Sequence, residues 1–212
     1  MTARSLFDPL PLAERLFVRG RMFSAPLRKV ALRAPPEGRI ADVGCGHGAM
    51  SALLVWNHPK RQVLGVDPDE RKIDWARASV GRAPNARFQT GSAGSLPTQG
   101  FDALVICDVV YLLPPERWPA FFTECRRALV PGGKLLLKET EDDGSWRTAK
   151  CLAQEKLMVR VLRRTKDSGG LQLLPRASTV SALEKTGFRV REVVTMSQGY
   201  TTPHVLFDAE CV

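Results

Sequence analysis

The sequence lacks the run of about 18 to 20 apolar residues that a membrane-spanning helix requires. It also lacks the apolar core of a secretory leader, because Asp8, Glu14, Arg15 and Arg19 interrupt every apolar stretch near the N-terminus. With 44% hydrophobic and 25% charged residues, the composition is typical of a folded globular protein. We therefore expect a cytoplasmic protein without a transmembrane segment.

Paired cysteines are absent as well. Five cysteines are scattered along the chain, and no two of them have the C-x-x-C spacing that zinc sites use. We therefore expect no metal site, and reduced, mostly buried thiols that pack as small apolar side chains. The cysteines are Cys45, Cys107, Cys125, Cys151 and Cys211.

Acidic residues are few relative to basic ones, 22 against 31, which gives a net charge of +9. This surplus admits an anionic partner such as RNA, an acidic carrier protein or a membrane surface. Nucleic-acid recognition, however, needs a coherent basic stripe, and here the basic residues are spread along the chain. Charge alone therefore disfavours a nucleic-acid partner.

Short apolar runs of β type alternate with helical patterns between about residues 38 and 140. This alternation predicts a parallel sheet with helices on both faces, because parallel neighbours are joined by right-handed helical crossovers. The fold class we expect is a doubly wound, Rossmann-like α/β three-layer sandwich. The predicted strands are 39–43, 62–66, 86–90, 101–107 and 134–139, and the predicted helices are 49–56, 69–80 and 115–129.

The two ends of the chain have other patterns. A helix after Pro11 and a second helix at 27–33 precede the helix-breaking Pro35 and Pro36. Residues 145–164 predict a long basic helix, and 178–186 a short one. The β-type runs 189–197 and 204–210 predict an antiparallel hairpin at the edge of a seven-stranded, mostly parallel sheet. We expect one domain, divided into a helical cap (1–36), a core (37–140), a helical lid (141–187) and the hairpin (188–212).

A glycine-rich turn, Gly44-Cys45-Gly46-His47-Gly48, directly follows the first strand of the predicted sheet. Glycine is needed where the backbone turns sharply or where a ligand approaches without meeting a Cβ. Asp67 ends the next strand, where a carboxylate can accept hydrogen bonds from two ribose hydroxyls. Both features lie at the carboxyl ends of strands, where such sheets bind ligands. They fit either an adenosine-bearing sulfonium cofactor or NAD.

These residues resemble the class I S-adenosylmethionine-dependent methyltransferases. The segment 42–48 is similar to the first motif of the family, and Gly65-Val66-Asp67 is similar to its second-strand acid. Segments 101–108 and 111–114 are similar to the fourth-strand motif. Residues 129–137, with the turn at 131–133, are similar to the entry into strand five. The resemblance covers about residues 38 to 140, so the expected core is a cofactor-binding core and the implied cofactor is S-adenosyl-L-methionine.

The resemblance implies where the methionine part of the cofactor lies. Gly44 and Gly46 would lie against it, and Asp42 would receive its ammonium group directly or through water. Asp108, just past strand four, would lie near the methionine moiety and the transferred methyl.

For the adenosine part, the resemblance implies that Asp67 holds the ribose hydroxyls and that Ser92 and Ala93 border the adenine. The family often has an acidic residue where Ser92 stands. A serine hydroxyl accepts a hydrogen bond as a weaker, uncharged partner. Adenine contact at Ser92 is therefore less strongly implied than ribose contact at Asp67.

Methyl transfer from a sulfonium requires little chemistry from the protein, because the donor is already electrophilic. The protein must hold the acceptor atom about 3 Å from the methyl group, and a general base helps when the acceptor is a hydroxyl. We expect Tyr111 to contact the substrate and Glu139 to act as a base or a polar anchor. Of the histidines, His204 is the best candidate for a base, and Trp146 is a candidate wall of the pocket.

The activity that the sequence favours is methyl transfer to an oxygen or nitrogen of a small molecule, with apolar and aromatic acceptors included. Methylation of RNA or protein is an alternative, although segment 113–116 lacks the amide and the aromatic of an Asn-Pro-Pro-Tyr motif. An NAD-dependent oxidoreductase is disfavoured by Asp42 and the turn at 131–133. A non-catalytic binding module is disfavoured by the intact acids Asp42, Asp67 and Asp108. Neither the acceptor nor the oligomeric state can be read from the sequence.

Overall fold

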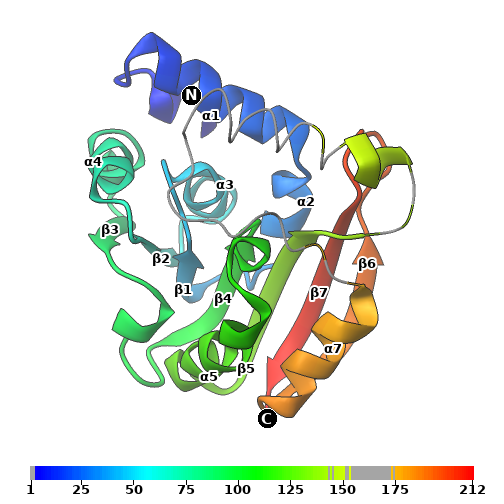
Figure 1. The fold of residues 1–212 in the computed structure, drawn as a ribbon. Coiled ribbons are helices and arrows are strands. Elements are labelled where there is room, and N and C mark those ends of the chain that lie inside the picture. The colour runs from blue at the N-terminus through cyan, green and yellow to red at the C-terminus, as the bar shows by residue number, and fades with distance from the viewer. Residues whose placement is uncertain (1–2, 143, 145, 151–152, 154–172, 174) are drawn as a thin grey trace.

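The computed structural model describes residues 3–142, 144, 146–150, 153, 173 and 175–212. Its centre is a seven-stranded sheet, shown in Figure 1. The strands are β1 (Gly38–Val43), β2 (Arg61–Asp67), β3 (Ala86–Thr90), β4 (Phe101–Cys107), β5 (Leu129–Thr140), β6 (Phe188–Thr195) and β7 (His204–Cys211).

The strand order is β3-β2-β1-β4-β5-β7-β6. Strands β1 to β5 are parallel to one another, whereas β7 is antiparallel to both β5 and β6. The chain order therefore reverses between β1 and β4, which is the point where sheets of this kind bind ligands. The predicted fold class and the antiparallel C-terminal hairpin are confirmed.

Helices cover both faces of the sheet (Figure 1). In chain order, residues of the first four of these helices, α1 to α4, pack in one apolar core. Residues of the last two, α5 and α7, pack in a second core on the opposite face. The helices are α1 (Leu12–Ser24), α2 (Leu27–Ala31), α3 (Ala49–Asn57), α4 (Glu70–Ala78), α5 (Trp118–Ala128) and α7 (Arg176–Lys185).

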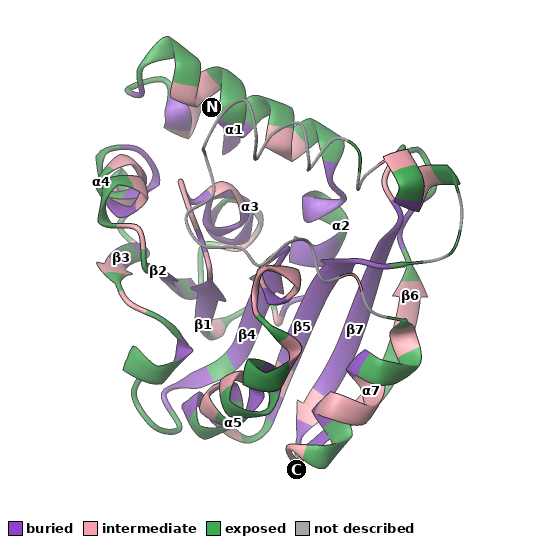
Figure 2. Cartoon of the chain, viewed as in Figure 1, coloured by how far each residue is buried: buried purple, intermediate pink, exposed green. Residues whose placement is uncertain are grey.

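The central strands are buried on both sides, as the largely purple strands of Figure 2 show. In β5, Leu136 joins one core while Leu135 and Leu137 join the other, because successive side chains point to opposite faces. A sheet covered on both faces needs such unbroken apolar runs. Lys138, which continues this run, is also fully buried and therefore needs a buried partner of opposite charge.

Helix boundaries follow local chemistry. The Asp69 side chain accepts hydrogen bonds from the backbone N–H groups of Arg71 and Lys72, so α4 begins one residue after the predicted start. In α5, Trp118, Phe122 and Cys125 form the buried stripe that the apolar spacing indicates.

The flanking helices are only partly accounted for by the sequence. Helix α1 forms after Pro11, with Val18 buried, but Leu12 and Leu16 are exposed. Residues 146–150 are helical, and most of the predicted helix at 145–164 lies outside the described residues. In the described part of the chain, no helix is both long and apolar enough to cross a membrane.

Candidate functional site

The glycine turn leaves β1 with a left-handed backbone at Gly44, where φ is +74°. A Cβ built on Gly44 would lie only 2.3 Å from Cγ2 of Val109, so a side chain does not fit there. The backbone N–H groups of Gly44 and Cys45 both donate to the carbonyl of Val66, at 2.8 and 3.0 Å, which fastens the turn to the end of β2. At Gly46, φ is +52° and a Cβ would meet no described atom within 4 Å, so space is open beside this residue.

Asp67 lies directly against this turn. Its Oδ2 accepts a hydrogen bond from the Gly46 N–H at 2.9 Å, and its Oδ1 accepts one from the Asp69 N–H at 2.9 Å. An ionised carboxylate offers about four lone-pair positions, so two backbone donors leave acceptor capacity at both oxygens. The turn and the acid, 21 residues apart in the sequence, thus form one cradle at the carboxyl ends of β1 and β2.

Asp42 lies inside the protein. Its Oδ2 accepts hydrogen bonds from the backbone N–H and the hydroxyl of Ser51, at 2.9 and 2.6 Å. Burial raises the pKa of Asp42 to about 6, against the opposing effect of the Ser51 hydrogen bonds. In this structure the side chain anchors α3 behind the turn, and its contact with an ammonium group stays a prediction.

The loop after β3 adjoins Asp67, because the N–H of Gly91 donates to the Asp67 carbonyl at 3.1 Å. Ser92 is exposed, and its carbonyl accepts hydrogen bonds from the N–H and the hydroxyl of Ser95. Ala93 is fully buried in the core on the α5 side. Of the two predicted adenine neighbours, therefore, only Ser92 offers a free surface in this structure.

Asp108 follows β4 with a positive φ of 58° and lies in an ion triad with the buried Lys138 and the partly exposed Arg21. Lys138 Nζ donates to its two oxygens at 2.6 and 2.7 Å, and Arg21 donates to Oδ2 at 2.5 Å. Burial raises the pKa of Asp108, but Lys138 and then Arg21 outweigh it and hold this pKa well below its usual value. The triad carries two positive charges and one negative. Because Arg21 belongs to the last turn of α1, this contact places the C-terminal end of α1 beside the site.

Glu139 ends β5 with two carboxyl oxygens in different surroundings. Oε1 accepts hydrogen bonds from the N–H groups of Val109 and Val110, at 3.1 and 2.9 Å. Oε2 is buried and has no hydrogen-bond partner among the described residues. Burial, followed by the charge of Asp108, raises the pKa of Glu139 to about 8. At neutral pH this carboxyl is therefore mostly protonated.

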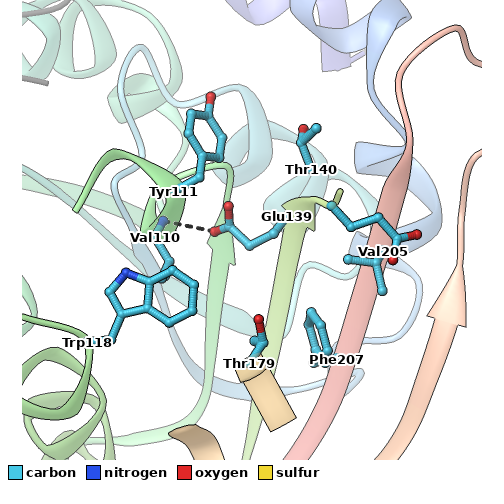
Figure 3. A pocket seen from close by; sticks show the side chains of 9 residues that line it. Val110, Tyr111, Trp118, Glu139, Thr140, Thr179, Val205 and Phe207 are labelled. Atoms are coloured by element: carbon cyan, nitrogen blue, oxygen red, sulfur yellow. Dashed lines mark hydrogen bonds between the residues drawn. The ribbon is translucent and has the colours of Figure 1, made fainter. Parts of the chain in front are cut away.

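Glu139 lines a small pocket past the ends of β4 and β5 (Figure 3). Its volume is about 10 Å³, the space of roughly one water molecule. Tyr111, the predicted substrate contact, lines the same pocket and is half-buried. The other lining residues are Val110, Trp118, Thr140, Glu141, Thr179, Val205 and Phe207.

His204 is buried at the start of β7, outside this pocket lining. Its Nε2 lies 3.2 Å from the carbonyl of Ser24. A carbonyl only accepts, so Nε2 carries the hydrogen and Nδ1 is the acceptor, which has no partner among the described residues. Burial and then Lys138 lower the pKa of His204 to about 4. Trp146, the predicted wall, is 64% exposed and stacks on Arg147 instead.

The structure thus gathers the predicted residues into two groups. Gly44, Gly46 and Asp67 meet at the ends of β1 and β2, and Asp108 meets Glu139 at the ends of β4 and β5. Sequence reasoning missed Lys138 and Arg21. A lysine that continues a buried leucine run was a signal for a buried anion, whereas nothing in the local pattern showed that α1 would deliver Arg21 to the same place.

Residues 40–133 match the protein family described as "Methyltransferase domain". This range contains the glycine turn, Asp67 and Asp108, and the sheet has the strand order described above. Within this range the chain matches the class I S-adenosylmethionine-dependent methyltransferases, and its fold agrees with theirs. S-adenosylmethionine is the methyl donor of this family.

Two curated relatives align with the methyltransferase region. A trans-aconitate 2-methyltransferase of Deinococcus radiodurans is 31% identical over 136 residues, which are 62% of this chain and 51% of that protein. A fatty-acid O-methyltransferase of Mycolicibacterium smegmatis is 34% identical over 109 residues, 50% of this chain and 39% of that protein. The chain therefore spans about half, or less, of the length of these relatives.

Among solved structures, a geranyl diphosphate methyltransferase in complex with SAM has the same fold. The TM-score is 0.69 at 14% sequence identity, and the match covers 98% of this chain and 94% of that one. At this identity the likeness concerns the fold.

Proposed function

We propose that this methyltransferase binds S-adenosylmethionine beside Gly46 and transfers its methyl group to an oxygen of a small-molecule carboxylic acid. The observation that carries the proposed binding of the donor is the hydrogen bond between the Gly46 N–H and Asp67, beside the point between β1 and β4 where the strand order reverses. The residues fit the cofactor. The open space beside Gly46 accommodates the methionine part, and the spare lone pairs of Asp67 accept from the ribose hydroxyls.

Arg21 extends this proposed site. It lies beside Asp108, and its charge also acts on Asp42. A guanidinium in this position suits the carboxylate of the methionine moiety, which would complete the charge balance of the triad. Helix α1 would then contribute directly to cofactor binding.

The described side chains near the proposed acceptor site are weak bases at neutral pH. Glu139 is mostly neutral at pH 7, and the pKa of His204 near 4 makes that ring a weak base. A hydroxyl acceptor would need a base to take its proton, whereas a carboxylic acid already arrives as the nucleophilic carboxylate. A protonated amine would likewise need a base to take its proton before it could attack. An acid is therefore the acceptor class that the site supports best, in keeping with the acids named in the two relatives.

The protein's part in this reaction is binding and alignment. S-adenosylmethionine supplies an electrophilic methyl group when bound. Asp67 and the glycine turn hold the donor, and the pocket beside Glu139 holds the acceptor within reach. Holding the two reactants together is itself a large part of the catalysis, because it replaces an encounter in solution.

Calorimetric titration with S-adenosylhomocysteine tests the donor half. Asp67→Ala is expected to weaken binding by about 1–3 kcal/mol, because the hydrogen bonds to the ribose are lost, and Asp67→Asn by less. Asp102→Asn is the matched control. Asp102 also accepts a backbone N–H, from Arg39 at 2.7 Å, but at the amino ends of β1 and β4, far from the glycine turn, so affinity should not change.

Two outcomes would contradict the proposal. One is a wild-type protein that binds NAD but not S-adenosylhomocysteine, and the other is an Asp67→Ala variant with wild-type affinity. The acceptor half is tested with labelled S-adenosylmethionine and two acids, trans-aconitate and dodecanoate. Transfer of label to at least one acid is expected, and transfer to neither would refute the acid class.

A further inference from the structure

The hydrogen bonds of Glu139 are divided unequally between its two oxygens. Oε1 accepts both backbone N–H groups, and Oε2 has no described partner although the residue is only 6% exposed. A neutral carboxylic acid divides its bonds in this way, because its carbonyl oxygen accepts and its hydroxyl donates. Oε2 is then a buried hydroxyl without a recipient. Leaving a buried donor unpaired is costly, so this position calls for an acceptor atom.

The pocket supplies a place for that atom. Glu139 lines it together with Tyr111 and Thr140, past the strand that carries Asp108 (Figure 3). A cavity of about 10 Å³ admits a single oxygen atom rather than a whole ligand. A bound acid would therefore place one carboxylate oxygen here while the rest of the molecule lies outside.

Glu141 lines the same pocket but differs from Glu139 in one respect. Both of its oxygens are bound by Arg176 of α7, one of them at 2.6 Å. Its charge is therefore balanced, and it has no need of a ligand. Of the two carboxyl groups that line the pocket, Glu139 is the one with an oxygen left over.

Charged and titratable groups face Glu139 from several elements. The charge of Asp108 favours the protonated form of Glu139, and that of Lys138 opposes it. His204 on β7 is neutral near pH 7, and so does not compete for this proton. Among the described residues, the charged and titratable groups around Asp108 and the pocket are Arg21 of α1, Asp108 after β4, Tyr111, Lys138 of β5, Glu141, Arg176 of α7 and His204 of β7.

We propose that Glu139 is a neutral hydrogen-bond donor whose Oε2 binds one carboxylate oxygen of the acceptor, which leaves the other oxygen to receive the methyl group. This inference rests on the proposed function, and it assigns Glu139 to substrate binding rather than to proton abstraction. A hydrogen bond from a carboxylic acid to a carboxylate is charge-assisted and short. The same geometry excludes an ionised Glu139 from this role, since two carboxylates would repel each other.

The test compares Glu139→Gln, Glu139→Ala and, as the matched control, Glu141→Gln, with trans-aconitate and dodecanoate as probes at saturating S-adenosylmethionine. For the wild type, KM for the acid should rise up to about tenfold per pH unit above pH 8, where the donor ionises. Glu139→Gln retains an N–H donor, so its KM should stay within about threefold of wild type at pH 7 and lose the pH dependence. Glu139→Ala should raise KM about tenfold or more at pH 7 and should lose the pH dependence. Glu141→Gln should keep the wild-type pH dependence.

The opposite pattern would overturn the inference. If Glu139 were a base, kcat would rise with pH towards 8 and Glu139→Gln would lose turnover at every pH. An Ala variant with wild-type KM would also refute the assignment. A readout independent of turnover is the infrared absorption of a protonated carboxyl at pH 7, expected in the wild type and missing in Glu139→Gln. Absence of that band in the wild type would refute the neutral donor.

Failure of the inference and failure of the proposed function give different results. S-adenosylhomocysteine titration of every variant reports the donor half, and all three variants should bind it as the wild type does. If the wild type does not bind it, the proposed function fails. If the wild type binds it and methylates an acid, but Glu139→Gln and Glu139→Ala have the same KM for that acid, only the role of Glu139 is refuted. Normal binding without methylation of either acid refutes both the acid class and this role.

Discussion

The donor side and the acceptor side of the site are built in different ways. At the ends of β1 and β2, Asp67 is held by backbone N–H groups from its own loop and from the adjoining glycine turn. At the ends of β4 and β5, Asp108 is held by side-chain charges, and one of them comes from α1, 87 residues away. Local sequence builds the first arrangement, and tertiary packing builds the second. Substitution of Asp67 should therefore chiefly reduce ligand binding, whereas substitution of Asp108 should chiefly reduce stability.

The largest effect is expected from Asp108→Asn. It leaves the buried charge of Lys138, and the partly exposed charge of Arg21, without a counter-ion, which should lower the free energy of unfolding by about 3–5 kcal/mol. Chemical denaturation measures it. The control is Asp8→Asn, which breaks the exposed pair with Arg19 and should cost less than about 1 kcal/mol. Equal losses in the two variants would show that the triad is not specially important for stability.

A pair of glycine substitutions separates stability from binding on the donor side. Gly44→Ala introduces both a strained φ and a clash with Val109, so the expected loss is about 2 kcal/mol or more of unfolding free energy. Gly46→Ala adds strain alone, about 1 kcal/mol, but its methyl enters the open space where the cofactor would lie. In thermal unfolding, Gly46→Ala should have the higher Tm of the two variants. In titration with S-adenosylhomocysteine, Gly44→Ala should have the higher affinity. The reverse order would place the ligand elsewhere.

The smallest effect is expected where α1 covers the glycine turn. Glu14 contacts His47 at 2.9 Å, with both side chains partly accessible. Burial, against the opposing charge of Glu14, lowers the pKa of His47, so near neutral pH this contact is chiefly a hydrogen bond. Glu14→Gln should therefore cost less than about 1 kcal/mol, or less than about 4 °C in Tm by calorimetry. A larger loss would mean that α1 is a major support of the donor side.

The sequence predicts the central sheet well because strands and helices there differ in apolar period. Strands β3 and β4 have the predicted bounds, and α3 differs from prediction by one residue. Strand β5 begins earlier than predicted, at Leu129, because residues on both sides of the turn at 131–133 pair with β4. The helix at 145–164 lies mostly outside the described residues and stays a prediction.

The candidate site was predictable where a short motif contains both partners of an interaction. The glycine turn and Asp67 are recognisable from their spacing, and the structure brings them into contact. The partners of Asp108 and His204 are not, because Arg21 and Ser24 come from the far end of the chain and meet them only after folding. Pattern reasoning therefore identified Glu139 and Tyr111 as residues of interest, without showing which charges set their chemistry.

The close approach of Gly44 to Val109 has a mechanical consequence. Val109 donates its backbone N–H to Glu139, so the residue that touches the donor turn also clamps the acceptor carboxyl. The two halves are thus joined through main chain and a short branched side chain, without a flexible arm between them. Any displacement of the turn is passed on to Glu139, and a misalignment of about 1 Å can slow a transfer about a hundredfold. The distance between the glycine turn and Glu139 is in this way set largely by the protein backbone.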